Sequence, residues 1–452
     1  MSTLYHTLLE VLAELETKQR EALDHAQRDA LTGLANRHLL DERLEQAILR
    51  YHRTGEKFAV IMLDLDHFKR VNDLLGHQVG DELLKEAAVR LQSLVRDTDT
   101  VARFGGDEFV ILQTGLAKLT DVRRLCSRIC QQMQVAYLVA SREMTLPVSV
   151  GVVVANGGPA DSSDYVRAAD LALYDAKSSG RNCYRFFSSE LDARLRRRDL
   201  LEMELRKAFQ SGEGLGVCFQ PQFNGNGKIS GVETLLRWKH KELGDISASE
   251  AVDIAEESGL IHLLGEYVFR EAARFARNRP EISVAVNLSP AQFSGSGNLA
   301  EDLRKMALQE RVNPQQIELE ITEQLFMRLD TGCEEQMKKL REYGFRLALD
   351  DFGTGYSSLS YLRRFKVDRL KLDRSFASCG EIGEDIALVR AAVTVAHLFG
   401  LDVVAEGIET EQQEAVALEG GCDVLQGFRY AAAMTAGEFD MYASTEKLRS
   451  AA

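Results

Sequence analysis

The first half of the chain alternates short apolar runs with amphipathic stretches, which is the pattern of an α/β domain. Each apolar run is long enough for one buried strand, and each amphipathic stretch repeats its apolar positions at helical spacing. Strands are predicted at residues 58–66, 101–112 and 146–155, and helices at residues 80–95 and 163–180. This half is therefore expected to form a largely antiparallel sheet with helices covering one face.

The second half contains eight apolar segments, most of them separated by helical stretches and ending in polar residues. They lie at residues 216–223, 228–238, 282–289, 316–322, 345–352, 369–373, 401–408 and 422–428. Eight such units in this length predict a (β/α)₈ barrel of the TIM type, in which polar side chains gather at the carboxyl ends of the strands.

Two helical segments lie outside these domains. Residues 1–28 place Leu4, Leu8, Val11 and Leu15 at heptad-like spacing, which fits either a short coiled coil or a helix packed on the first domain. Residues 188–204 are a charged helical linker. The predicted domains are residues 1–28 (signalling or dimerisation helix), 29–187 (first α/β domain), 188–204 (linker) and 205–447 (barrel).

Composition narrows the classes of partner. The net charge of -14 argues against nucleic acid, and no apolar run is long enough to span a membrane. Acidic residues interrupt the apolar positions at the N-terminus, so no signal peptide is predicted. The seven cysteines lack zinc-type spacing, and we expect reduced thiols in a cytoplasmic protein.

The hairpin at residues 101–112 raises a chemical question because Asp107 and Glu108 adjoin at its tip. Gly105 and Gly106 are expected to supply the positive φ angles of the turn. The two carboxylates are either a solvated acidic turn or half of a cation site. The strand at residues 58–66 ends in Asp64 and Asp66, alternate residues that share one face. Asp64 and Asp107 could therefore converge on Mg²⁺ from neighbouring strands.

The segments LDLDHFKRVNDLLGHQVGD, RFGGDEF and LYDAKSSGRN resemble the GGDEF family of diguanylate cyclases over residues 29–187. The resemblance implies a fold similar to nucleotidyl cyclases and polymerase palms, and the joining of two GTP molecules into cyclic di-GMP. By this resemblance, metal ions would be bound by Asp64, the Leu65 carbonyl and Asp107, and guanine by Asn72 and Asp81. The triphosphate would be bound by the backbone amides of Phe68 and Lys69 and by the side chains of Lys177 and Arg181. The catalytic residues would be Asp107 and Glu108.

Arg96 and Asp99 in the segment RDTD have the spacing of the inhibitory product site of that family. Binding of cyclic di-GMP there is one interpretation, and a solvated surface ion pair is the other.

The segments VNLSPAQF, LEITE, LALDDFGTGYSSL, LKLDRSF and AEGIET resemble the EAL family of cyclic di-GMP phosphodiesterases from residue 205 to about 440. The resemblance implies a two-metal hydrolase. Its implied metal ligands are Glu233, Asn287, Glu320, Asp350, Asp351 and Asp373. Lys371 and Glu406 would act on the attacking water, Arg237 and Gln426 would bind the ligand, and Glu323 would support the DFGTG loop.

The EAL-like segments also depart from the family pattern. Thr234 replaces the alanine of the name-giving motif, with a hydroxyl that can bond the backbone, and Lys241 replaces a proline. No departure removes an implied metal ligand. The sequence therefore predicts a bifunctional enzyme with two Mg²⁺ or Mn²⁺ ions per active site. It acts as a homodimer or higher oligomer, and a separate sensor protein can dock on the N-terminal helix. A phosphodiesterase with a regulatory GGDEF domain and an inactive nucleotide receptor are the alternatives.

Overall fold

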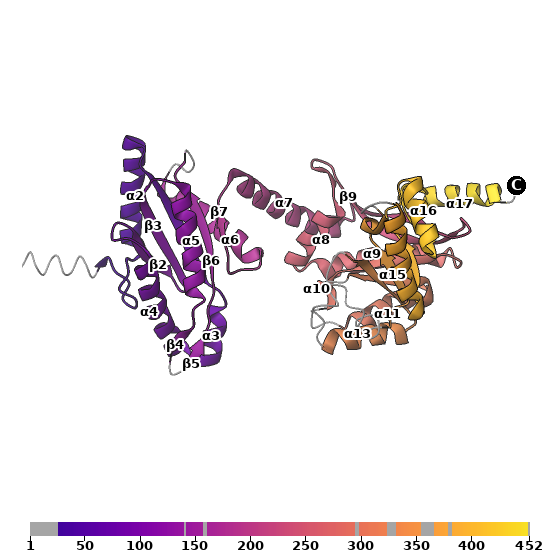
Figure 1. The fold of residues 1–452 in the computed structure, drawn as a ribbon, viewed down its shortest axis with the longest axis horizontal. Helices are drawn as coiled ribbons and strands as arrows, with labels where there is room; N and C mark the ends of the chain where they lie inside the picture. Colours follow the sequence, from indigo (N-terminus) through magenta and orange to yellow (C-terminus); the bar gives the residue numbers. More distant parts are fainter. Residues whose placement is uncertain are drawn as a thin grey trace, which may run out of the picture. The chain divides into compact units, whose positions relative to one another are not determined.

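The computed structural model describes residues 26–139, 142–156, 161–293, 298–322, 331–353, 366–377 and 382–450. The chain divides into two compact units, Met1–Arg197 and Arg198–Ala452 (Figure 1). Glu323 and the heptad positions of the predicted N-terminal helix lie outside the described residues. No helix in the described part of the chain is long and apolar enough to cross a membrane.

The first unit is built on a five-stranded sheet, which confirms the prediction of a largely antiparallel α/β domain. Its strand order is β2(Thr100–Gly105), β3(Glu108–Leu116), β1(Lys57–Leu65), β6(Val148–Val154) and β7(Tyr184–Phe186). Only the pairing of β6 with β7 is parallel. A short ribbon, β4(Tyr137–Val139) and β5(Arg142–Met144), stands apart from this sheet.

Helices cover both faces of this sheet, so the expectation of one covered face was wrong. The helices are α2(Arg37–Thr54), α3(Phe68–Leu75), α4(His77–Leu94), α5(Leu119–Met133) and α6(Ser162–Ser178). Ile61 and Leu63 of β1 pack in one core with α4 and α5, whereas Val60 and Met62 pack in a second core with α2 and α6. Alternate strand residues face opposite sides, and an unbroken apolar strand such as β1 needs cover on both.

The turn of the acidic hairpin differs by one residue from the prediction. Gly105 is not in the turn, because it ends β2 and pairs with Glu108. The two turn residues are Gly106 and Asp107, and of the two glycines only Gly106 has a positive φ angle, 51°. This shift puts Asp107 itself at the tip of the hairpin.

The predicted connector is helical: α7(Ser189–Ser211) runs through the boundary between the units. Its Leu191 and Leu195 pack with Ala172 of α6 in the first unit. Its Leu201 and Leu205 belong to an apolar cluster of the second unit that includes Trp238. Each end of α7 is thus part of the core of the unit that it adjoins.

The second unit is a closed barrel of eight strands, as predicted. The strands are β8(Leu215–Asn224), β9(Ile229–His240), β11(Ser283–Leu288), β12(Ile317–Thr322), β13(Arg346–Phe352), β14(Arg369–Leu372), β15(Asp402–Ala405) and β16(Val424–Leu425). The short β10(Gly244–Ile246) pairs with the end of β9.

One strand of the barrel departs from the all-parallel (β/α)₈ pattern. β8 runs antiparallel to both β9 and β16, whereas β9 and β11 to β16 are parallel to one another. Only residues 225–228 connect β8 to β9. A connection this short can join antiparallel strands but cannot cross back to start a parallel one.

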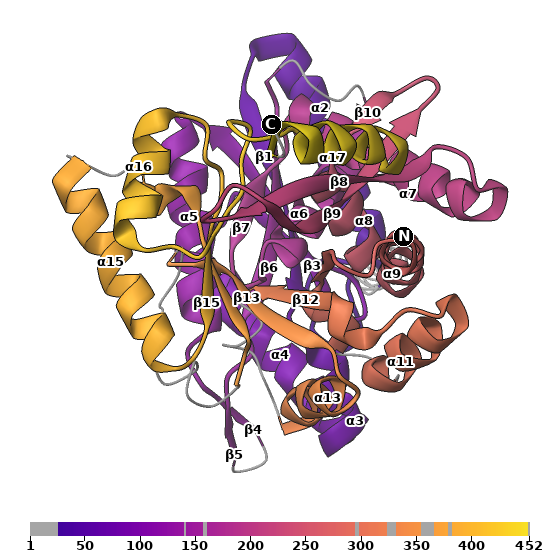
Figure 2. The same cartoon turned by 90° about the vertical axis from the view of Figure 1, so that its right-hand side faces the viewer.

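Helices surround the outside of the barrel (Figure 2). They are α8(Ala248–Glu257), α9(Ile261–Arg277), α10(Pro290–Phe293), α11(Leu299–Glu310), α13(Thr331–Glu342), α15(Ile382–Leu398), α16(Glu411–Gly420) and α17(Ala436–Ser450), with 3₁₀ turns at Pro314–Gln316 and Arg374–Ala377. Their apolar faces and the outward-facing residues of the strands form one large core. The inward-facing residues at the carboxyl ends of the strands are polar, and they form the barrel mouth.

Candidate functional site

The barrel mouth brings together most of the polar residues predicted for it. They are Glu233 on β9, Asn287 on β11, Glu320 on β12, Asp350 and Asp351 on β13, Lys371 on β14, and Asp373, Glu406 and Gln426 just beyond the ends of β14, β15 and β16. The parallel ladders explain this gathering, because they place Asn287 beside Glu320 and Thr322 beside Asp350. Residues at one end of neighbouring parallel strands share one rim of the barrel.

The buried ammonium group of Lys371 lies at the centre of four carboxylates. Its Nζ is 2.6 Å from Glu320 Oε1, 2.6 Å from Glu406 Oε1, 3.3 Å from Asp350 Oδ1 and 3.9 Å from Glu233 Oε1. Burial alone would lower the pKa of Lys371, but these negative charges outweigh it and hold the pKa well above its usual value.

The carboxylates around Lys371 hold protons more tightly than exposed ones. Burial raises the pKa of Glu320 well above its usual value, and the charges of Glu233, Asp350 and Glu406 add to that effect while Lys371 opposes it. Burial likewise raises the pKa of Glu406 to about 8. One ammonium group does not compensate four carboxylates, so the site favours a further positive charge, whether a proton or a metal ion.

The oxygen donors of the mouth fit a divalent cation. Glu320 Oε2 is buried and accepts no hydrogen bond from the described residues, although buried carboxylate oxygens normally have partners. No three Asp, Glu, His or Cys side chains of the described residues form a complete cation site in this conformation. The Lys371 ammonium explains this, because the carboxylates turn toward it. Carboxylate and amide oxygens are the ligands that Mg²⁺ and Mn²⁺ prefer.

A glutamine network that the sequence did not reveal supports the mouth from β8. Gln426 Nε2 donates to Glu233 Oε2 at 2.6 Å and to Gln220 Oε1 at 3.3 Å. Gln222 Nε2 donates to Gln426 Oε1 at 2.9 Å, which fixes the orientation of that amide. Asn287 Nδ2 donates to the other oxygen of Glu233 at 2.8 Å. The alternation of Gln220 and Gln222 along one strand was the available signal, because alternate residues share a face.

A cavity of about 970 Å³ opens beside this cluster. Asn287 and Asp351 border it on the polar side, and Leu235, Ile261 and Pro290 are among its apolar lining residues. Asp351 has a φ of 54°, an uncommon conformation for a residue with a side chain, and burial raises its pKa. The cavity is large enough for a nucleotide, and its lining combines apolar side chains with polar ones.

Two further predicted barrel residues bond to their own chain segments. Arg237 on β9 is partly buried and donates from Nη1 to its neighbour, the Leu236 carbonyl, at 2.8 Å. Asp373 is held by the backbone amide of Ser375 at 3.0 Å. Burial would raise the pKa of Asp373, but hydrogen bonds from Ser375 outweigh it and keep the pKa low.

The first unit gathers a second acidic cluster where β1 meets the hairpin. Asp64 on β1 pairs with Glu108 on β3, and the Leu65 amide donates to the Asp107 carbonyl at 3.4 Å. Lys177 of α6 reaches this cluster, with Nζ 2.7 Å from Asp64 Oδ2. Burial raises the pKa of Asp64, and the nearby Asp107 carboxylate raises it further while Lys177 opposes the shift. The structure thus brings the predicted Asp64, Asp107, Glu108 and Lys177 together.

The residues predicted to bind guanine and phosphate lie on α3 and α4. Phe68 and Lys69 form the first turn of α3, where backbone amides are available to an anion. Asn72 of α3 packs against α4: a Cβ added at Gly80 would lie 2.0 Å from Asn72 Oδ1. That oxygen is buried and has no hydrogen-bond partner in the described part of the chain, and Asp81 follows Gly80. Asn72 thus contacts α4 at Gly80, and the exposed Asp81 is the next residue of that helix.

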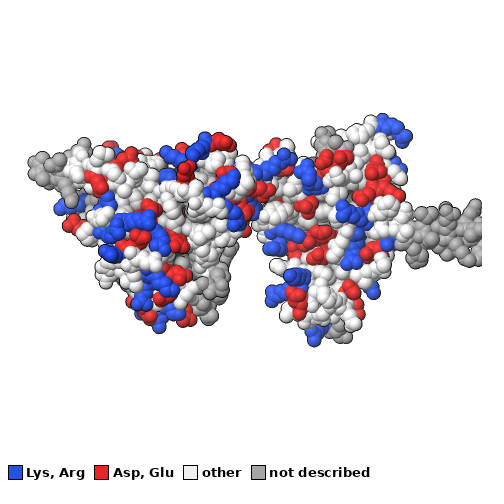
Figure 3. Space-filling model, turned by 180° about the vertical axis from the view of Figure 1, so that it is seen from behind, with Lys and Arg blue, Asp and Glu red and all other residues white. Residues whose placement is uncertain are grey.

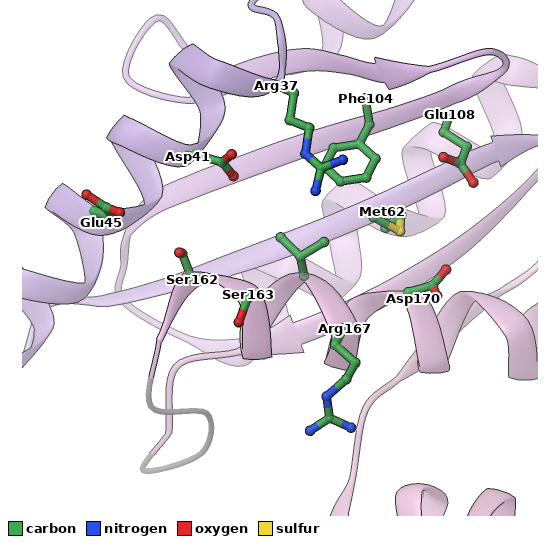
Figure 4. Close-up of a pocket in the computed structure, with 11 residues that line it drawn as sticks. Arg37, Asp41, Glu45, Met62, Phe104, Glu108, Ser162, Ser163, Arg167 and Asp170 are labelled. Carbon is green, nitrogen blue, oxygen red and sulfur yellow. The ribbon is translucent and has the colours of Figure 1, made fainter.

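A cavity of about 480 Å³ lies on the other side of Glu108, between α2 and α6 (Figure 4). Glu108 and Asp170 lie at one end of it, and Asp41 and Glu45 of α2 lie at the other. Burial raises the pKa of Glu108, and the charges of Asp64 and Asp170 raise it further. Asp170 was not predicted. It precedes Lys177 by two helical turns, a spacing that places both on one face of α6.

The predicted inhibitory pair is divided between surface and interior. Arg96 is exposed, whereas Asp99 is buried. The Asp99 carboxylate accepts hydrogen bonds from the backbone amides of Arg96, at 3.1 Å, and Thr114, at 3.3 Å. The alternative interpretation of a solvated surface ion pair is therefore wrong, because Asp99 is neither solvated nor joined to Arg96 through side chains. Arg96 is available to a ligand.

The molecular surface carries both signs of charge. Figure 3 shows Lys and Arg side chains interspersed with Asp and Glu on both units. The thiols of Cys126 and Cys130 are free and buried on α5, as expected of core cysteines.

The candidate functional residues of the molecule therefore gather in the two acidic clusters described above.

Family comparisons agree with this division into two sites. Residues 26–183 match the diguanylate cyclase, GGDEF domain, and residues 202–433 match the EAL domain. The chain therefore belongs to the family of proteins in which a GGDEF domain is followed by an EAL domain.

Three curated relatives are named for the turnover of cyclic di-GMP. The chain is 39% identical over 421 residues to the bifunctional diguanylate cyclase/cyclic di-GMP phosphodiesterase MucR of Pseudomonas aeruginosa, covering 92% of this chain and 61% of MucR. It is 36% identical to the cyclic di-GMP phosphodiesterase NbdA of the same species, covering 93% and 54%. It is 33% identical to the cyclic di-GMP phosphodiesterase PdeR of Escherichia coli, covering 94% and 65%. The chain thus spans between half and two thirds of these relatives.

Solved structures show the same folds. The PaMucR phosphodiesterase in complex with c-di-GMP matches 53% of this chain and 99% of its own, with a TM-score of 0.50 and 36% identity. The S helix-GGDEF-EAL part of LapD from Vibrio cholerae, bound to c-di-GMP, matches 93% of this chain and 99% of its own, with a TM-score of 0.51 and 20% identity. At that identity the likeness to LapD shows the fold alone.

Proposed function

We propose that the chain is a bifunctional enzyme of cyclic di-GMP turnover. Residues 29–187 condense two GTP molecules into cyclic di-GMP, and residues 205–447 hydrolyse cyclic di-GMP to the linear dinucleotide pGpG. The observation that carries the proposal is the cluster of four carboxylates around the buried Lys371. Burying so many charges is costly for the fold, and such clusters are concentrated at functional sites.

In the barrel, each polar group has a distinct task. Glu233, Asn287, Glu320 and Asp350 would hold one metal ion, and Asp350, Asp351 and Asp373 a second. Bound Mg²⁺ or Mn²⁺ would lower the pKa of water and neutralise phosphate charge. Lys371, as an ammonium group, and Glu406 orient the attacking water, and Glu406 accepts its proton. Arg237 and Gln426 bind the dinucleotide, and the adjoining cavity holds one of its bases. The predicted role of Glu323 at the DFGTG loop concerns residues outside the described part of the chain.

In the GGDEF domain, the 3′-hydroxyl of one GTP attacks the α-phosphorus of the other, and pyrophosphate leaves. Asp64, the Leu65 carbonyl and Asp107 would hold the metal ions. Asn72 and Asp81 bind guanine. The backbone amides of Phe68 and Lys69 and the side chains of Lys177 and Arg181 bind the triphosphate. Glu108, whose pKa is raised by burial, lies beside Asp64 and is suited to accept the proton of the hydroxyl.

One observation favours a second candidate, a phosphodiesterase whose GGDEF domain binds GTP only to regulate the barrel. Lys177 already neutralises Asp64 at 2.7 Å, which competes with a metal ion for that ligand. NbdA and PdeR, which are similar over nearly the whole chain, are named as phosphodiesterases. An inactive receptor of cyclic di-GMP is a weaker candidate, because binding alone does not need Lys371 among four carboxylates.

The proposed condensation reaction also requires a particular oligomeric state. Condensing two GTP molecules requires two GGDEF sites to face each other, since each site supplies one nucleotide. We therefore propose a cytoplasmic homodimer or higher oligomer, with residues 1–28 as its dimerisation helix or as the docking site of a separate sensor protein.

The deciding experiment is nucleotide chromatography of the purified protein after incubation with GTP and, separately, with cyclic di-GMP. Wild type should form cyclic di-GMP from GTP and pGpG from cyclic di-GMP. Glu233→Ala should lower pGpG formation at least about 100-fold, because the site loses a metal ligand, and leave synthesis intact. Glu242→Ala, which changes an exposed carboxylate beyond β9, is the control. Unchanged hydrolysis in Glu233→Ala contradicts the barrel assignment, and wild type without synthesis favours the second candidate.

A further inference from the structure

Asp66 is a buried carboxylate that neither proposed activity uses. It follows the end of β1, two residues after Asp64, and its side chain is 1% exposed. The Ser149 hydroxyl donates to Oδ1 at 2.7 Å, and the Asn182 backbone amide donates to Oδ2 at 3.1 Å. Each oxygen of Asp66 thus binds a different element, β6 on one side and the loop after α6 on the other.

The loop held by Asp66 has an unusual backbone. Gly180, Arg181 and Asn182 follow one another with φ angles of 103°, 62° and 50°. The left-handed conformation is unfavourable for residues that carry a Cβ, so two such residues in succession persist only where the surroundings enforce them. The hydrogen bond from the Asn182 amide to Asp66 fixes the last of these three residues.

Both ends of the loop are attached to the first unit as well. The Arg181 amide donates to the Ala176 carbonyl at 3.1 Å, and the Val150 amide donates to the Cys183 carbonyl at 2.9 Å. These bonds fix where the loop leaves α6 and where it joins β7. They do not fix the direction of the Arg181 side chain, which depends on the backbone angles in between.

The loop carries one of the two cations proposed to bind the triphosphate. Arg181 Nε is 4.0 Å from Asp66 Oδ1, and the Arg181 side chain is 48% exposed. The other cation, Lys177, lies one turn earlier, 2.7 Å from Asp64. Asp64 and Asp66 therefore hold the two cations from neighbouring positions of one chain segment.

We infer that Asp66 is a positioning residue of the cyclase site: it holds Gly180–Asn182 in the left-handed conformation and so directs Arg181 toward the triphosphate, without touching the nucleotide. The inference rests on the proposed binding of GTP by the GGDEF domain. A carboxylate suits this position because it accepts from Ser149 and Asn182 at once and faces a guanidinium. A residue that merely stabilised the fold would have no effect specific to Arg181.

A double-mutant cycle on the full chain tests this role. The probe is guanosine 5′-[α,β-methylene]triphosphate with Mg²⁺, measured by calorimetry. Asp66→Ala and Arg181→Ala should each weaken binding about tenfold, the size expected for loss of one charge-assisted contact. The double variant should bind about as weakly as Arg181→Ala alone, because interacting residues are not additive. Additive losses, giving about 100-fold, would show that Asp66 acts independently of Arg181 and would overturn the inference.

Two further variants separate loop geometry from charge. Asp66→Asn can keep the bond from the Asn182 amide and let the Ser149 hydroxyl reverse its role, so we expect it to fold and to bind about threefold more weakly. Ser149→Ala leaves the loop bond in place and should bind within about twofold of wild type. Hydrogen exchange at the Asn182 amide should accelerate in Asp66→Ala and not in Ser149→Ala; equal exchange in all variants would overturn the anchoring of the loop.

The outcomes also separate this inference from the proposed function. If wild type binds none of the GTP analogue, the nucleotide site itself is wrong and the role of Asp66 falls with it. If wild type binds the analogue and Asp66→Ala binds it equally well, the nucleotide site stands and only the role of Asp66 is lost.

Discussion

Thr234 is buried, and its hydroxyl has no hydrogen-bond partner among the described residues. It is 2% exposed, and its Oγ1 makes no hydrogen bond with the described residues. The expected bond between this hydroxyl and the backbone is therefore not formed. An unpaired buried hydroxyl costs about 1–3 kcal/mol of folding free energy. The family pattern has alanine here, which avoids that cost.

We predict that Thr234→Val stabilises the barrel by about 1 kcal/mol, because valine has the same shape without the hydroxyl. Urea unfolding followed by tryptophan fluorescence measures the effect, since Trp238 is the single tryptophan of the chain and is buried in the barrel unit. Thr394→Val, at an exposed position whose hydroxyl already bonds the Arg390 carbonyl, should give no gain. A lower midpoint for Thr234→Val would mean that the hydroxyl has a partner after all.

At the scale of residues, sequence reasoning located the barrel-mouth groups but not their pairing. Glu320 and Asp350 could be found because each lies toward the carboxyl end of an apolar strand, and barrel geometry brings strand ends together. Glu233 lies inside β9 and was found through the resemblance to the EAL family. The central place of Lys371 could not be found, because it depends on side-chain directions across the barrel. The support from Gln222 had a signal in its alternation with Gln220, which the prediction did not use. Asp66 was read with Asp64 as one face of a strand, whereas β1 ends before it.

At the scale of elements, one arginine links the start of the first unit to the acidic hairpin. Arg103 Nη1 is 3.3 Å from Asp29 Oδ1, and its Nε and Nη2 donate to the Gly106 carbonyl at 3.0 and 2.7 Å. Asp29 in turn accepts from the Thr32 hydroxyl at 2.6 Å. The turn that presents Asp107 is therefore braced by residues more than seventy positions earlier in the chain.

This brace predicts a pH-dependent stability. Burial would raise the pKa of Asp29, but hydrogen bonds from Thr32 and the charge of Arg103 outweigh it and lower the pKa. A folded-state pKa below the unfolded value adds stability above the unfolded pKa of about 3.9, and the gain disappears as the pH falls through the folded value. Asp29→Asn should therefore lower the thermal midpoint of the first unit at pH 7 and lose that difference toward pH 3 and below.

Scanning calorimetry between pH 3 and pH 7 checks this prediction. The fluorescence of Trp238, recorded in parallel, shows which transition belongs to the barrel unit. Asp97→Asn, which changes an exposed carboxylate, is the control and should have no effect on the midpoint at any pH. A midpoint difference for Asp29→Asn that stays constant with pH would contradict the role assigned to the carboxylate charge.

The arrangement of elements was predictable where a sequence pattern repeats. It was not predictable where a short connection or a single residue sets the direction of a strand or the position of a turn. The eight barrel strands followed from eight apolar segments, but the direction of β8 depends on the brevity of the 225–228 connection. The second covered face of the first sheet was encoded in the unbroken run of β1, which was read only as a strand. The hairpin turn was displaced by one residue, because GGD offers two glycines and the geometry uses one.

At the scale of the whole molecule, two units with separate cores allow each ligand to be assigned to its unit. A ligand at 100 times its dissociation constant stabilises the unit that binds it by about 2.7 kcal/mol. We predict that cyclic di-GMP, with a chelator present to stop turnover, raises both the barrel transition and that of the first unit. The second shift reports binding at Arg96, the exposed residue of the proposed inhibitory site.

Arg96→Ala should remove the shift of the first unit and leave the barrel shift unchanged. Calorimetry combined with Trp238 fluorescence distinguishes the two transitions. Arg124→Ala, at an exposed position on α5, is the matched control. If the first unit responds equally in Arg96→Ala and wild type, the RDTD segment is only the turn that Asp99 holds in place.

The antiparallel direction of β8, the first strand of the barrel, has a consequence for folding during synthesis. β8 pairs with β9 at nine positions, from Phe223–Ile229 beside the turn to Leu215–Trp238. It meets β16 only through Asn224–Val424 and Phe223–Leu425. The β8–β9 hairpin can thus form before the rest of the barrel has emerged from the ribosome. The barrel itself stays open at least until residue 425 emerges. Up to that moment β8 keeps an unpaired edge, which is a template for wrong association. Chains that stall or end before β16 should therefore aggregate instead of folding into smaller barrels.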